Sequence, residues 1–158
     1  MTHPSSSIQR ILQAAGQIRW LPPLLLRAVL GAVFVQTGWG KLEHLESFRA
    51  YFAQLGIPLA DVQAPLVAGL ELFGGALLVL GLGTRLAAAL LSGVMLVAMA
   101  TAIWPGLSSW HQLPGTVEAI YFSTFVYLAV HGPGAISLDT LVARRVGFAA
   151  ALRTQTQE

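Results

Sequence analysis

The sequence predicts an all-α integral membrane protein of one domain: a four-transmembrane-helix bundle with an outer amphipathic helix between spans one and two. Charged residues make up only 10% of the 158 residues and hydrophobic residues 55%, whereas a soluble domain carries about 25% charged residues. So few charges cannot cover a surface exposed to water. The apolar runs are continuous and lack the period-2 alternation of strands, so they predict helices.

Four apolar segments each have about the length at which a helix crosses a hydrocarbon core of ~30 Å. They cover residues 21–40, 62–82, 86–104 and 114–131, and the last is the shortest. In residues 43–55, apolar side chains recur at helical spacing with charged side chains between them. This pattern predicts an amphipathic helix that lies on the outer leaflet.

The distribution of Lys and Arg predicts the orientation of the chain. Of the Lys and Arg residues outside the spans, six lie on one side of a four-span chain and two on the other: Arg10, Arg19, Arg85, Arg144, Arg145 and Arg153 against Lys41 and Arg49. The positive-inside rule then places both termini in the cytoplasm of a bacterial inner (plasma) membrane protein. We expect three parts: a cytoplasmic interfacial segment over residues 1–20, the membrane domain over 21–140, and a cytoplasmic basic tail over 141–158.

Several kinds of chemistry find no support in the sequence. The chain has no cysteine, which excludes thiol–disulfide exchange and thiolate ligation of a metal. It contains no nucleotide-binding loop, catalytic triad or paired-carboxylate motif. His44 and His111 lie on separate loops without the spacing of a metal motif, so no metal site is predicted. No basic run exceeds Arg144-Arg145, so no nucleic-acid partner is expected. We therefore expect no catalysis by this chain alone.

Charged residues inside apolar spans are the main candidates for a site. Arg27 and Glu71 are the only charges in spans one and two, and an ionisable residue inside a membrane is a functional-site hypothesis. At ~1.5 Å per residue, they lie about 9 Å and about 16 Å from the inner ends of their spans, so a long arginine is expected to pair with Glu71. The pair either fixes helix register or forms a polar site for a proton or a ligand headgroup. Lys41 and Glu118, at the outer edge, either pair or extend to water.

Aromatic residues of the amphipathic segment suggest where a ligand would lie. Phe48, Tyr51 and Phe52 are predicted to roof a cavity that leads down to Glu71. An aromatic roof with a few polar groups below it suits a largely apolar ligand with a polar head. The alternative is that the segment 43–55 simply floats at the interface. Small residues next to Glu71 and in span one either let helices approach closely or make room for a ligand.

Four groups of residues resemble the motifs of the DoxX family of small membrane proteins, over about residues 22–140. The group that resembles its first helix is Arg27, Leu30-Gly31, Phe34, Gly38 and Lys41-Leu42, and the group that resembles its outer loop is Phe48, Tyr51-Phe52 and Leu55-Gly56-Ile57-Pro58. The group that resembles its second helix and the following turn is Glu71-Leu72, Gly74-Gly75, Leu80-Gly81-Leu82 and Thr84-Arg85. The group that resembles its closing motif is Gly132-Pro133-Gly134 and Ser137-Leu138-Asp139.

The resemblance implies a four-helix membrane protein linked to redox chemistry. DoxD-type relatives are subunits of thiosulfate:quinone oxidoreductases, and other members associate with membrane oxidoreductase complexes. We therefore expect an accessory or quinone-interacting subunit with a protein partner, a central polar site formed by Arg27, Glu71, Tyr51 and Phe52, and quinone rather than any covalent cofactor. Two alternatives stay open: a scaffold that recruits a redox, peptide-modifying or metal-stress partner, and a small transporter. A homo-oligomer is also open.

Overall fold

The computed structural model describes residues 16–145. Its helices, in chain order, are α2 (Leu21–Glu43), α3 (Leu45–Gln54), α4 (Ala60–Leu80), α5 (Thr84–Ala98), a π-helical turn η1 (Met99–Ile103), two 3-10 helices, η2 (Trp104–Gly106) and η3 (Trp110–Gly115), and α6 (Val117–His131). Residues 138–145 are also helical, and the described part of the chain contains no strand. The predicted all-α fold, with a short amphipathic helix after the first span, is confirmed.

Three stretches are long and apolar enough to cross a membrane: α2, α4, and the continuous helical run Thr84–Gly106 that begins with α5. The fourth, α6, is apolar but has 15 residues, which matches the expectation that the last span is the shortest. Most of the predicted N-terminal segment (1–15) and the end of the basic tail (146–158) lie outside the described residues.

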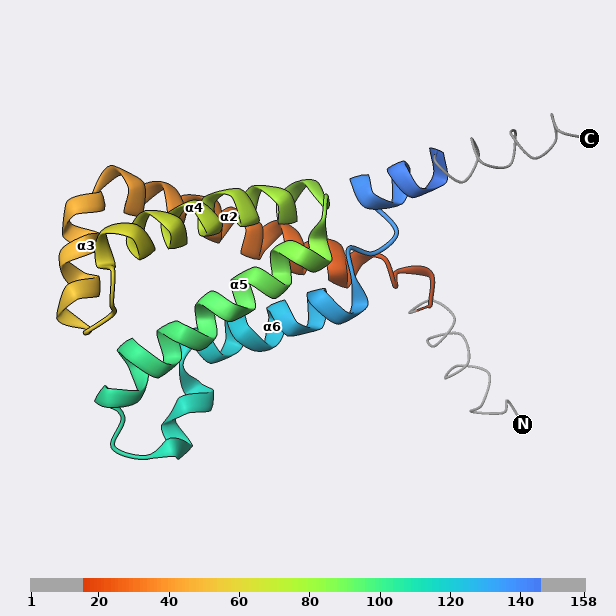
Figure 1. Cartoon of the computed structure of the whole chain (residues 1–158). Coiled ribbons are helices and arrows are strands. Elements are labelled where there is room, and N and C mark those ends of the chain that lie inside the picture. The colour runs from red at the N-terminus through yellow and green to blue at the C-terminus, as the bar shows by residue number, and fades with distance from the viewer. Residues whose placement is uncertain (1–15, 146–158) are drawn as a thin grey trace, which may run out of the picture.

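The bundle consists of two antiparallel helix pairs (Figure 1). α2 packs mainly against α4, and α5 mainly against α6, while α4 and α5 join the pairs. We call the end with the start of α2, the turn 81–83 and the end of α6 the closed end. The opposite end, with α3, η2 and η3, is the open end. In Figure 1 the two pairs lie together at the closed end and diverge toward the open end.

Glycines set the contact between α2 and α4. A Cβ added at Gly31 would lie 2.7 Å from the carbonyl oxygen of Gly75, and a Cβ at Gly38 would meet the backbone of Leu72. The two helix backbones therefore touch, which confirms the prediction that small residues allow close approach. Gly75 itself packs against the α2 backbone, so it serves helix packing and makes no room for a ligand.

Large apolar side chains fill the space between the pairs at the closed end. Phe34 of α2 packs edge-on against Phe125 and Tyr121 of α6, at ring-centroid distances of 4.8 Å and 5.4 Å. Lipid tails are as apolar as these side chains, so close packing rather than the hydrophobic effect holds such helices together. The large side chains with the least exposure in this core belong to α4, α5 and α6: Leu78, Leu91, Phe125 and Leu128.

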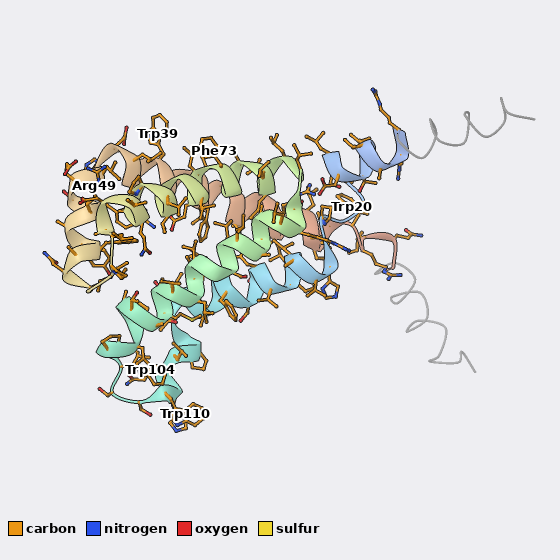
Figure 2. All side chains as sticks on the ribbon, viewed as in Figure 1. Trp20, Trp39, Arg49, Phe73, Trp104 and Trp110 are labelled. Atoms are coloured by element: carbon orange, nitrogen blue, oxygen red, sulfur yellow. The ribbon has the colours of Figure 1, made fainter. Side chains whose placement is uncertain are left out.

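The outer surface is suited to lipid. Trp39 and Phe73 project from α2 and α4 away from the other helix pair (Figure 2), with 57% and 68% of their surfaces exposed. Trp20 lies at the closed end, and Trp104 and Trp110 lie at the open end. Tryptophan prefers the headgroup level of a bilayer, so these positions mark the two membrane surfaces.

The segment after α6 stabilises the closed end through hydrogen bonds. Gly81 and Gly83 both adopt positive φ in the α4–α5 turn, of 67° and 57°, a conformation that glycine adopts without strain. The Asp139 carboxylate accepts hydrogen bonds from the backbone amides of Gly83 (2.7 Å) and Thr84 (3.1 Å), and its own amide donates to the Gly81 carbonyl (2.9 Å). Asp139 thus caps the start of α5, where Gly83 has no side chain to do so.

Candidate functional site

A cavity of about 600 Å³ lies between the two helix pairs, toward the open end. Apolar side chains of α2, α4 and α5 form most of its wall. Phe48, Tyr51 and Phe52 of α3 line it together with Glu71 of α4, as the sequence predicted for these aromatic residues. α3 packs on α4, and Phe52 is buried, so this helix belongs to the bundle and does not float at the interface.

Lys41 and Glu71 form an ion pair on the wall of this cavity. The Lys41 Nζ donates to both Glu71 oxygens, at 2.5 Å and 2.6 Å. The Glu71 side chain is only 2% exposed, whereas that of Lys41 is 31% exposed. The ammonium also lies 5.0 Å from the centroid of the Phe48 ring, within the range of a cation–π contact. The pair places one buried carboxylate and one accessible ammonium beside an apolar space.

The predicted Arg27–Glu71 pair is wrong. Arg27 is 2% exposed, and its guanidinium donates to the carbonyl oxygens of Pro133 (2.8 Å) and Ile136 (2.5 Å) in the segment after α6. Arg27 therefore binds the segment after α6 at the closed end and does not line the cavity.

Helix register explains this correction. Because Gly38 faces Leu72 and the two helices are antiparallel, the α2 position level with Glu71 lies near Trp39, about twelve residues beyond Arg27, or about 18 Å along the axis. The Arg27 guanidinium instead lies beside Gly81, just past the end of α4. α2 thus extends beyond α4 at the closed end, so distances counted from the two span ends understated the separation of the charges.

Of the two alternatives for Lys41 and Glu118, the structure does not show the pair, because the Lys41 ammonium is bound by Glu71. Lys41 lies about two residues beyond the α2 position level with Glu71, or about 3 Å along the axis, and its four-carbon stem covers that distance. Glu118, in the first turn of α6, lines the same cavity. Within residues 16–145 it has no ion pair or hydrogen-bond partner for its side chain.

Further cavity residues escaped the sequence analysis. Gly93 and Thr101 line the wall from α5 and η1, and Tyr121 lines it from α6. Leu90, Gly93, Val97 and Thr101 recur at helical spacing and line the cavity from one face of this helical run. The Thr101 hydroxyl donates to the Val97 carbonyl at 2.8 Å. A glycine facing a cavity gives no sequence signal that distinguishes it from one that packs.

Comparison with known proteins identifies the family. The sequence profile of the family DoxX matches residues 23–104. "Putative oxidoreductase CatD" of Bacillus subtilis (strain 168) is 29% identical over 119 residues, which cover 75% of this chain and 85% of that protein. "Inner membrane protein YqjF" of Escherichia coli (strain K12) is 28% identical over 122 residues, which cover 77% of this chain and 92% of that protein. No solved structure matches the chain significantly. The matched profile spans more than half of the sequence, so this chain belongs to the DoxX family of membrane proteins.

Proposed function

We propose that this protein is an inner-membrane accessory subunit of a redox system, and that its cavity holds a quinone-like carrier. The inner membrane is supported by the name of the relative YqjF, and the redox system by the word oxidoreductase in the name of CatD. The observation that carries the proposal is the cavity itself, with apolar and aromatic walls beside the Lys41–Glu71 pair.

The composition of the cavity suits such a carrier. Its volume of about 600 Å³ falls within the usual range for small-molecule sites, which are mostly apolar with a few placed polar groups. An ammonium has three donors. Two contacts of Lys41 are to Glu71, so one donor is left for an oxygen of the ligand headgroup. The ring of the ligand would lie among the aromatic side chains, and an isoprenoid tail would extend to lipid.

The cavity wall is continuous with the surface that faces lipid. Leu90 and Val97 of α5 line the cavity, yet they are 47% and 52% exposed. Both side chains therefore belong to the cavity and to the outer apolar surface. A carrier dissolved in the bilayer would reach the cavity past α5 without crossing water.

We expect Gly93→Leu to weaken carrier binding strongly without destabilising the protein. A Cβ at Gly93 meets nothing within 4 Å, and Gly93 lines the cavity, so the leucine fills space that the ligand needs. The affinity for decylubiquinone should fall at least about tenfold, which corresponds to ~1.4 kcal/mol. Titration calorimetry of the purified protein in detergent measures this affinity, and thermal unfolding checks stability.

The matched control is Gly69→Leu. Gly69, on α4, also has nothing within 4 Å of an added Cβ, but it does not line the cavity, so this variant should bind like wild type. If wild type binds no better than an unrelated four-helix membrane protein, the carrier proposal is wrong. Equal binding by wild type and Gly93→Leu would place the site elsewhere.

We also propose that the closed end faces the cytoplasm. Arg85, Arg144 and Arg145 belong to the segments of this end, whereas Lys41 and Arg49 lie toward α3, in line with the positive-inside rule. Reporter domains fused after residues 60, 84, 110 and 158 should read outside, inside, outside and inside. An outside signal at residue 158 would contradict the four-span topology.

A further inference from the structure

We propose that Glu118 makes the cavity select the reduced, hydroquinone form of the carrier over the oxidised quinone. This inference rests on the proposed function, because it concerns the headgroup preference of the same cavity. It follows from the balance of charges and hydrogen-bonding groups on the cavity wall.

The cavity carries an excess carboxylate. Three charged side chains line it: Lys41, Glu71 and Glu118. The ammonium of Lys41 lies against both oxygens of Glu71, so these two charges cancel. The nearby cation Arg49 pairs with Glu46 at 2.9 Å, outside the cavity. Glu118 thus faces a largely apolar space with no side-chain partner among the described residues.

The position of Glu118 in α6 leaves its carboxyl group available to a ligand. It lies in the first turn of α6, where the free backbone amides favour a negative charge. The cap of this helix is nevertheless formed by Thr116, whose hydroxyl accepts the hydrogen bond from the Ala119 amide at 3.3 Å. Glu118 is therefore not needed as the capping side chain and remains free to accept hydrogen bonds from a ligand.

The two forms of the carrier differ in the groups that they offer to a carboxylate. An ionised carboxylate only accepts hydrogen bonds. A hydroquinone has two O–H donors, whereas a quinone has two carbonyl oxygens whose lone pairs repel a carboxylate. The remaining donor of Lys41 can bind an oxygen of either form, so it anchors both. Discrimination between the two forms therefore falls to Glu118.

The test compares decylubiquinol with decylubiquinone, each titrated under anaerobic conditions into the purified protein. A hydrogen bond to a charged group typically corresponds to a factor of about ten or more in affinity, so wild type should bind decylubiquinol about tenfold more tightly. Glu118→Gln should bring the ratio of the two affinities close to one, because an amide both donates and accepts. Glu118→Asp keeps the carboxylate and should keep the preference.

Glu46→Gln is the matched control, because Glu46 is an exposed carboxylate that does not line the cavity. It should leave the ratio unchanged. A ratio near one in wild type, with both ligands bound, would overturn the role of Glu118 and leave the proposed function intact. Binding of neither ligand would overturn both. If tetraphenylphosphonium binds more tightly than decylubiquinol and Glu118→Gln removes this binding, the cavity is a site for apolar cations and the inference is overturned.

Discussion

Glu71→Leu is expected to lower the free energy of unfolding by about 3 kcal/mol, because removing one partner of a buried ion pair leaves the other charge uncompensated. The charge left behind is the Lys41 ammonium, whose ion pair in the described structure is with Glu71. Lys41→Met should cost a similar amount, because the Glu71 carboxylate is almost completely buried. The Lys41→Met/Glu71→Leu double variant should recover part of the loss. Denaturant unfolding in detergent micelles measures all three values.

A second cycle tests the corrected pairing. The effects of Arg27→Leu and Glu71→Leu should add within about 0.5 kcal/mol, because the two side chains share no partner and lie far apart along the bundle. Coupling above 1 kcal/mol between Arg27 and Glu71 would contradict the structure, as would additive losses for Lys41 and Glu71. Both cycles use Glu71→Leu, so a general loss of folding caused by this variant would affect both alike. It could not give coupling in the cycle with Lys41 and additivity in the cycle with Arg27.

Gly38→Ala is the second change with a large expected effect. Its new Cβ would meet the backbone nitrogen and Cα of Leu72, and backbone atoms inside two packed helices cannot move aside as a side chain can. We expect a loss of about 3 kcal/mol, the upper part of the range for overpacking a core. Thermal unfolding of the purified variant measures it.

Gly40→Ala provides the control for this substitution. Gly40 is in the same helix, and a Cβ there meets nothing within 4 Å, so the change should be neutral or slightly stabilising because alanine favours helix over glycine. If both variants unfold at the wild-type temperature, α2 and α4 do not touch along this line. If both are strongly destabilised, the cause is not the contact with Leu72.

The fold could be read from the sequence because span length and apolar runs depend on the bilayer, which acts on each helix separately. The amphipathic α3 and the packing role of Gly31 and Gly38 were also predictable, because each depends on a local pattern of residues. The partner of Glu71 was not predictable in this way. It depends on how far α2 slides along α4, and this offset is set by contacts between glycines and the facing backbone.

The candidate site was predicted in part. Tyr51, Phe52 and Glu71 line one cavity, because α3 packs on α4 and buries Phe52; the sequence alone left open whether this helix packs on the bundle or floats at the interface. Arg27 was wrongly included because an unpaired charge suggests an opposite charge, whereas its partners are backbone carbonyls of Pro133 and Ile136. Backbone groups carry no sequence signal, so a cation that binds them cannot be distinguished in advance from one that binds a carboxylate.

The partners of Arg27 also impose an order of events during synthesis. The two carbonyl groups lie 106 and 109 positions later in the chain, so at about 5–20 residues per second they are made roughly 5–20 s after Arg27 leaves the peptidyl transferase centre. During that interval the first helix must insert with its guanidinium directed to the nearby headgroups, as long cationic side chains near helix ends do. The closing segment therefore completes the bundle only after every span has been made.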